Sequence, residues 1–110
     1  MIVKVFIRRH FKEGNDTEAF NLLKKIRLKA MEYEGYISGD TLVNTNDPKE
    51  IMVISTWQSM DNWNTWKKSE DRKNIDSLLE VLQTTPTLYE SFVFSKYRLS
   101  AKTGFADHPG

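Results

Sequence analysis

Three tryptophans, Trp57, Trp63 and Trp66, fall close together in a chain of 110 residues. Trp63 and Trp66 stand three positions apart, so in a helix they would share one face. Aromatic side chains at this spacing most often pack in a core. They can also wall a pocket for a flat, apolar ligand, and one indole can do both. We therefore treat Trp63 as a candidate substrate-binding residue and Trp66 as a candidate catalytic one.

Polar candidates follow further along the chain. Arg72 and Asp76 are four positions apart, which is the spacing of an ion pair on one helix face. We favour an exposed pair of little energetic weight. Beside a pocket, Arg72 would instead hold a phenolate or carboxylate, with Asp76 as its neighbour. Tyr36, Tyr89 and Tyr97 could donate hydrogen bonds to a bound quinol or pack as ordinary amphipathic side chains, and Tyr97 is taken as a candidate.

His10 is the candidate base. A neutral imidazole can take a phenolic proton near neutral pH, although a histidine at the end of a strand is more often simply solvated. The second histidine, His108, is assigned no role. Two distant histidines without clustered carboxylates predict no metal site, and the absence of cysteine excludes thiolate chemistry. No phosphate-binding glycine loop, dinucleotide fingerprint or nucleophile motif is present, so we predict no cofactor.

Charge and composition narrow the partners. The chain carries 16 basic and 15 acidic residues, a net charge of +1, which gives no field to attract nucleic acid or an anionic membrane. The N-terminus has neither the order of a signal peptide nor the length of a membrane span. We expect a cytoplasmic protein, with a small aromatic ligand as a possible partner.

The sequence alternates between segments with strand and helix periodicity. Residues 2–10 alternate in hydropathy, with Val3, Val5 and Ile7 on one face and Ile2 and Phe6 on the other. The further strands are expected at 36–43, 51–57 and 88–97. The second and third of the four strands are separated by turn residues and predict a hairpin.

Two helical segments complete the pattern. The first is expected over about 17–33, with a capping box between Asn15 and Glu18 and a left-handed stop at Gly35. The second begins after Ser59, bends or restarts at Ser69 and ends before Pro86.

The resulting order, β-α-β-β-α-β, predicts a ferredoxin-like α+β fold: a four-stranded antiparallel sheet with both helices on one face. The domain should span residues 1–100, followed by a polar tail at 101–110. The other sheet face would expose Ile2, Phe6, Phe92 and Phe94. Such a patch is unusual in a monomer, so we expect a homodimer that pairs these faces, rather than a tail or loop that covers them.

Three short strings carry a family resemblance. Glu34-Gly35-Tyr36 follows the first helix, Trp57-Gln58-Ser59 joins the third strand to the second helix, and Trp63-Asn64-Thr65-Trp66 lies inside that helix, with Ser69 after it. Over residues 2–97 the chain resembles the antibiotic biosynthesis monooxygenase domain family. The resemblance implies a dimeric α+β barrel with a pocket between sheet and helices in each subunit.

Activities in that family vary. Some members oxidise polycyclic phenols or quinols with O2 and no metal, some degrade haem, and some are isomerases. The haem-degrading branch uses an asparagine on the first strand, a tryptophan in the second helix and a histidine further along. Trp66 is similar to that tryptophan, but Asp76 stands at the histidine position and the first strand has no asparagine. The resemblance therefore does not imply haem degradation.

Three functions compete at this point. The first is a cofactor-independent monooxygenase that deprotonates and encloses a small aromatic or quinol-type substrate. The second is a ligand-binding module without catalysis, favoured by the scarcity of titratable pairs. The third is RNA binding, because RNA-recognition domains share this strand order. The third strand, 51–57, lacks their basic-aromatic motif, so RNA binding is not expected.

Overall fold

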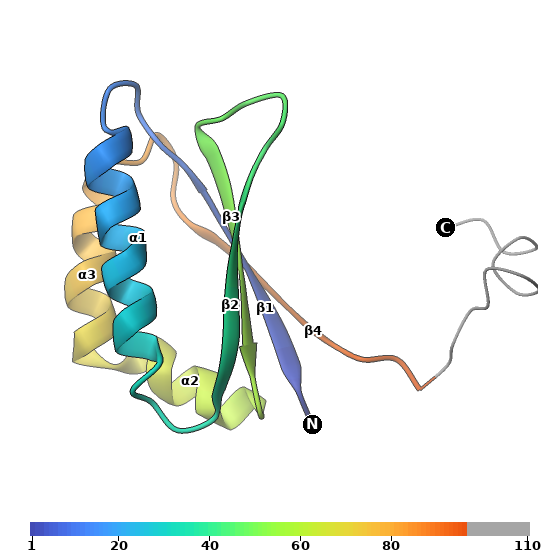
Figure 1. Ribbon diagram of the computed structural model, residues 1–110. Helices are drawn as coiled ribbons and strands as arrows, with labels where there is room; N and C mark the ends of the chain where they lie inside the picture. The colour runs from blue at the N-terminus through green and yellow to red at the C-terminus, as the bar shows by residue number, and fades with distance from the viewer. Residues whose placement is uncertain (97–110) are drawn as a thin grey trace, which may run out of the picture.

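The computed structural model describes residues 1–96. Seven elements follow one another in the order β-α-β-β-α-α-β, and Figure 1 shows their arrangement. They are β1 Val3–His10, α1 Asp16–Ala30, β2 Tyr36–Val43, β3 Glu50–Trp57, α2 Met60–Lys68, α3 Glu70–Val81 and β4 Leu88–Val93. The predicted α+β fold is confirmed, with the second helical segment divided in two. The last predicted strand, 88–97, ends earlier than expected, at Val93. Tyr97, the predicted tail at 101–110 and His108 lie outside the described residues.

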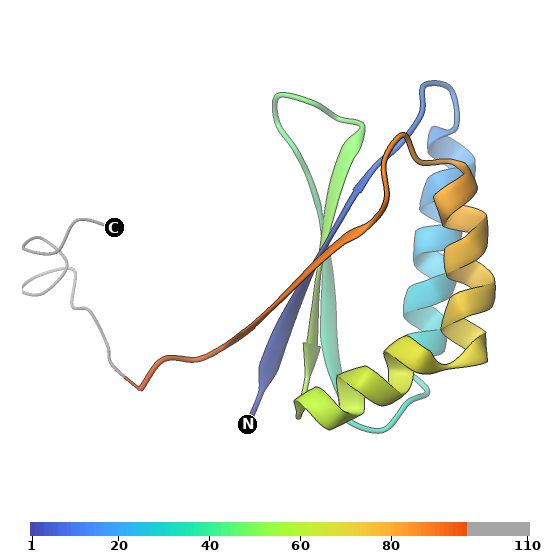
Figure 2. The same ribbon diagram turned by 180° about the vertical axis from the view of Figure 1, so that it is seen from behind.

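The four strands form one antiparallel sheet in the order β2-β3-β1-β4. The β2–β3 hairpin is the one predicted, and β1 lies in the centre between β3 and β4. The helices α1 and α3 lie side by side against one face of this sheet, and α2 crosses its lower end (Figures 1 and 2). None of the helices in residues 1–96 is long and apolar enough to cross a membrane.

The inner face of the sheet forms the core with the helices. Val3, Val5 and Ile7 of β1 are buried, as their alternation predicts. One cluster joins these residues to Ala30 and the three tryptophans; a second cluster, at the other end, gathers around Leu79. Each large apolar side chain buried in this way contributes roughly 1.5–3 kcal/mol to folding.

The ends of α1 differ from the prediction. Asn15 precedes the helix, but its side chain makes no capping hydrogen bond, because its backbone (φ −115°, ψ 22°) lies outside the extended region that a capping residue adopts. The predicted capping box is therefore wrong. The helix ends at Ala30, and the left-handed Gly35 (φ 85°) lies in the turn that leads into β2. A Cβ on Gly35 would come within 2.3 Å of the Asn62 side chain, so this turn requires glycine.

Ser69 divides the second helical segment. Its backbone is extended (φ −67°, ψ 148°), its Oγ accepts a hydrogen bond from Arg72 N at 3.1 Å, and the same Oγ donates to Trp66 O at 2.7 Å. Ser69 thus closes α2 and caps α3. The predicted cap at Ser59 is also confirmed, since its Oγ accepts a bond from Asn62 N. The break turns α3 away from α2 and sends it along α1, as seen in Figure 2.

The outer face of the sheet carries no helix (Figure 1). Ile2, Phe92 and Phe94 are 43%, 53% and 64% exposed, and the rings of Phe6 and Phe92 meet edge to face at 5.2 Å. The predicted apolar outer face is therefore present in the single chain.

Candidate functional site

A cavity lies between the inner face of the sheet and the helices, and residues from all seven elements line it. Water molecules can occupy about 40 Å3 of the cavity, and its whole empty space, including the open mouth, is about 510 Å3. One water molecule takes roughly 10–15 Å3 of the smaller volume, so the cavity is narrow and has room for a few waters. A ring-sized ligand must therefore move side chains near the mouth.

Trp63 and Trp66 form part of the apolar wall. Each is 3% exposed, and both belong to the core cluster. Trp66 stacks on Trp57 with ring centres 6.3 Å apart, and Tyr33 meets it edge-on at 4.8 Å. The two tryptophans thus fill the core and line the cavity, and neighbouring rings fix their orientation.

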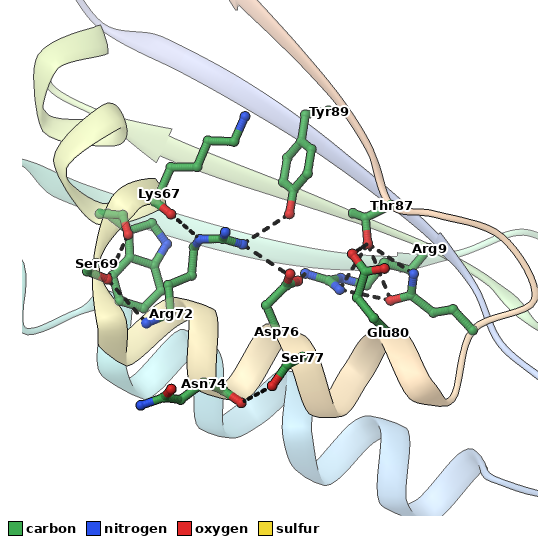
Figure 3. Close-up of polar contacts among 12 residues, drawn as sticks. Arg9, Lys67, Ser69, Arg72, Asn74, Asp76, Ser77, Glu80, Thr87 and Tyr89 are labelled. Atoms are coloured by element: carbon green, nitrogen blue, oxygen red, sulfur yellow. Dashed lines mark hydrogen bonds and ion pairs between the residues drawn. The ribbon is translucent and has the colours of Figure 1, made fainter.

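A network of buried charges lines another part of the cavity (Figure 3). Arg9 Nη2 lies 2.8 Å from Asp76 Oδ1, and Arg72 Nη1 lies 3.6 Å from the same oxygen. Arg9 is 4% and Arg72 8% exposed, and the Asp76 side chain is 15% exposed. The expectation of an exposed Arg72–Asp76 pair is therefore wrong, because α3 packs this face against β1 and β4. Two guanidinium groups share one carboxylate, which leaves an excess positive charge inside the protein.

Further hydrogen bonds hold the two arginines in place. Arg9 Nη1 donates to Gln83 Oε1 at 2.8 Å, and Arg72 Nε donates to the backbone carbonyl of Lys67 at 2.6 Å. Arg72 Nη1 also donates to Tyr89 Oη at 3.1 Å. Arg72 therefore connects the end of α2, the side of α3 and strand β4.

Tyr89 carries a hydroxyl group in this network, and the residue also lines the cavity. Burial raises the pKa of Tyr89, and the nearby Asp76 carboxylate raises it further; Arg9 and Arg72 act in the opposite direction. The phenol is consequently neutral near neutral pH and keeps its proton. Its oxygen accepts from Arg72, while within residues 1–96 its proton has no recorded acceptor. Tyr89 can thus donate to an oxygen atom of a ligand.

Another part of the cavity wall is built from α1 and β2. Arg27, Tyr36 and Gly39 line it, and Arg27 Nη2 donates to Thr41 Oγ1. Burial raises the pKa of Tyr36, Arg27 lowers it, and the exposed Asp40 raises it. This part of the wall is polar.

His10 lies away from the cavity, at the far end of β1. Its Nδ1 is 2.8 Å from Thr84 Oγ1 and its Nε2 is 2.7 Å from Asp47 Oδ2. The hydrogen bond from His10, together with that from the Lys49 backbone, lowers the pKa of Asp47. The structure brings Trp63, Trp66, Arg72 and Asp76 together, but does not bring His10 to them.

Two cavity residues could have been found from the sequence. Arg9 has the same parity as Val3, Val5 and Ile7, so the alternation of β1 already places it on the inner face. Arg27 follows Leu23 by four positions and shares its helix face. Both were obscured by the general rule that arginine side chains are exposed. Within residues 1–96, no group of three or more acidic, histidine or cysteine side chains could hold a metal ion.

Comparison with solved structures reveals the same fold in other proteins. A conserved protein from Methanosarcina mazei Go1 is 18% identical over 84% of this chain and 91% of its own, with a TM-score of 0.78. SnoaB, a cofactor-independent oxygenase from Streptomyces nogalater, is 13% identical over 88% and 97% of the two chains, with a TM-score of 0.75. These identities establish similarity of fold alone.

The sequence itself gives the family. No curated protein matches the chain. The family model described as antibiotic biosynthesis monooxygenase matches residues 2–76, which is more than half of the chain and includes the tryptophans, Arg72 and Asp76. The chain therefore belongs to the antibiotic biosynthesis monooxygenase family.

Proposed function

We propose that the protein is a cofactor-independent monooxygenase that oxidises a small phenol or quinol in the cavity beside Trp66. Family membership and a fold shared with SnoaB support oxygenase chemistry. The observation that carries the proposal is the Arg72–Tyr89 hydrogen bond at the wall of a largely apolar cavity. A buried cation and a polarised hydroxyl together stabilise an oxygen anion on a flat ring.

The chemistry needs no cofactor because the substrate is the reductant. An ionised phenol delivers electrons to O2, and a bond forms between a ring carbon and one oxygen atom. Loss of the ring proton and cleavage of the O–O bond then release the second oxygen as water and leave a quinone. The protein's part is to hold the ring, stabilise the anion and exclude bulk water from the peroxide.

Six residues in and beside the cavity have roles in this proposal. The ring lies against Trp63 and Trp66, and Arg72 and Tyr89 bind the phenolate oxygen. Asp76 and Arg9 position Arg72. Arg72 and Tyr89 offset part of the cost of burying the ionised phenol, and solvent at the mouth accepts its proton. His10, which lies away from the cavity, is not needed as the base.

The test is oxygen uptake with 1-naphthol, with mass spectrometry of the quinone formed under isotopically labelled O2. We expect one labelled oxygen atom in the product. Tyr89→Phe should lower kcat by about 100–1,000-fold, the usual cost of losing one donor to an oxyanion. Tyr33→Phe is the matched control, because the Tyr33 hydroxyl donates to the exposed Asp71. Uptake no faster than in buffer, or equal rates in both variants, would reject the proposal.

A second candidate is ligand binding without turnover. Arg9 and Arg72 both contact the Asp76 carboxylate, so this carboxylate is not free to act as a base. This observation favours binding without turnover. If the protein only binds its ligand, Trp66→Phe alters the affinity for 1-naphthol measured by calorimetry. Oxygen uptake then stays at background both in this variant and in the unmodified protein.

We also propose that two copies pair through the outer face of the sheet. The exposed Phe92 and Phe94 and the family's dimeric barrels support this arrangement. Each subunit would then keep its own cavity on the opposite side of the sheet. A solution mass near that of one chain, 12.9 kDa, would exclude the pairing.

A further inference from the structure

Arg27 is a half-buried cation that forms no ion pair within residues 1–96. It lies in α1 and lines the cavity. Within residues 1–96, no carboxylate lies within ion-pair distance of its guanidinium group, and its recorded hydrogen bond goes to the neutral hydroxyl of Thr41. A partly desolvated guanidinium group gains most from a carboxylate, which it can bind with two parallel hydrogen bonds.

Gly39 lets two polar groups approach each other over the backbone of β2. A Cβ at this position would lie 2.7 Å from Tyr36 Oη and 3.0 Å from Arg27 Nε. Both groups therefore occupy the space that a side chain would fill. Glycine inside a strand weakens the strand and often marks a site where another group comes close. The guanidinium group of Arg27 and the hydroxyl of Tyr36 thus form a compact pair of donors at the cavity wall.

The charge around the cavity is unbalanced. Arg9, Arg27 and Arg72 line it, and within residues 1–96 no acidic side chain does. Asp76 contacts two of these arginines from behind and offsets one charge. The remaining charge acts in a narrow, largely apolar space, where electrostatic attraction is stronger than in water. A ligand with a single phenolate beside Arg72 would still leave Arg27 unpaired.

We infer that Arg27, Tyr36 and the bare backbone at Gly39 form a carboxylate subsite, so that the preferred ligand is a planar aromatic acid. This inference rests on the proposed function only because both place the ligand in the same cavity. The ring would lie against Trp63 and Trp66, with its carboxylate toward Arg27. A phenolic oxygen on the same ring would point toward Arg72 and Tyr89, and the two polar ends would fix the orientation of the substrate.

The experiment compares two probes of nearly equal shape, 2-naphthoate and its neutral amide 2-naphthamide. Calorimetry gives the Kd of each for the full chain and for Arg27→Gln, with Lys24→Gln on the same helix as the control. Lys24 is exposed and does not line the cavity. We expect Arg27→Gln to raise the Kd of naphthoate by about 10-fold or more, the range for a hydrogen bond to a charged group. The Kd of naphthamide should change less than about 2-fold, within the small effect of a remote charge.

A second variant guards against a folding defect. Gly39→Ala keeps the charge of Arg27 but displaces it and Tyr36, so it should also weaken naphthoate binding selectively. Thermal unfolding shows whether either variant is folded, and Arg27→Lys should recover part of the affinity. The inference is overturned if naphthoate does not bind, or if the two probes respond equally to Arg27→Gln. Oxygen uptake with 1-naphthol is measured in parallel, so selective binding without uptake retains the subsite and rejects the oxygenase.

Discussion

One carboxylate oxygen of Asp76 accepts a hydrogen bond from Arg9 and forms a longer ion pair, at 3.6 Å, with Arg72. Arg9 and Arg72 are both largely removed from water. A buried cation is tolerated when an anion and hydrogen-bond acceptors surround it, and removal of that anion exposes the full cost of burying the charge. Asp76 thus keeps two positive charges stable beside the cavity.

Asp76→Asn should therefore destabilise the protein strongly. We expect the free energy of unfolding, measured with urea, to fall by about 3 kcal/mol, the usual cost of breaking a buried ion pair from one side. Asp71→Asn, an exposed carboxylate in the same helix, should cost about 1 kcal/mol or less. Equal losses in the two variants would mean that the buried network contributes little to stability.

The sequence predicted the identity of several site residues better than their surroundings. The spacing of Arg72 and Asp76 indicates a helical pair, and that pair exists. The spacing of residues within one helix does not show which other elements pack against that helix. In this structure β1 brings Arg9 to Asp76, and β4 brings Tyr89 to Arg72. These contacts join residues up to 67 positions apart, so they depend on tertiary packing.

At the scale of elements, one residue sets the angle between two helices. Ser69 is extended, ends α2 and starts α3, and its Oγ bonds to both helices. Without this break, one straight helix could not both place Trp66 over the sheet and bring Arg72 to β4. The break is thus part of how the cavity is closed.

Ser69→Ala should lower the free energy of unfolding by about 1 kcal/mol, the typical cost of losing an N-cap side chain. Ser77→Ala is the control, since the exposed Ser77 Oγ only donates to a carbonyl within α3. It should cost less than about 0.5 kcal/mol, as for most surface substitutions. Chemical denaturation of both variants gives the comparison, and a neutral Ser69→Ala would contradict the capping role.

Periodicity and turn chemistry predicted most elements closely. The range 36–43 agrees with β2, and the restart at Ser69 was anticipated from residue type. The pattern predicts the end of α1 too late, because Gly35 resembles a helix stop, whereas this glycine lies in a turn that packs against Asn62. That requirement comes from a helix distant in the sequence, so local patterns do not contain it.

At the scale of the whole molecule, the two faces of the sheet differ. The helices cover the inner face and leave the outer face without a helix (Figures 1 and 2). Phe92 and Phe94 are exposed. Register places Lys4 opposite Phe92 on this face. A negative charge at position 92 would therefore be tolerated by the single chain and opposed by an apolar partner.

Phe92→Glu should convert a dimer into monomers. Burial of a charge in an apolar interface is unfavourable, so the dissociation constant should rise by at least about 100-fold. Leu78→Glu is a matched control on the helical side, since Leu78 is 52% and Phe92 53% exposed. Analytical ultracentrifugation should find a dimer for Leu78→Glu and monomers for Phe92→Glu. A dimer for Phe92→Glu would mean that pairing uses another surface.

The central position of β1 has a consequence for how this protein can change over evolution. Successive residues of β1 serve opposite sides: Ile7 and Arg9 line the cavity, whereas Phe6 and Arg8 face outward. Insertion or deletion of a single residue in this strand would exchange the two sets in one step. Length changes are therefore far more tolerable in the loop between β2 and β3 than in β1, where they would disturb the cavity wall and the outer face together.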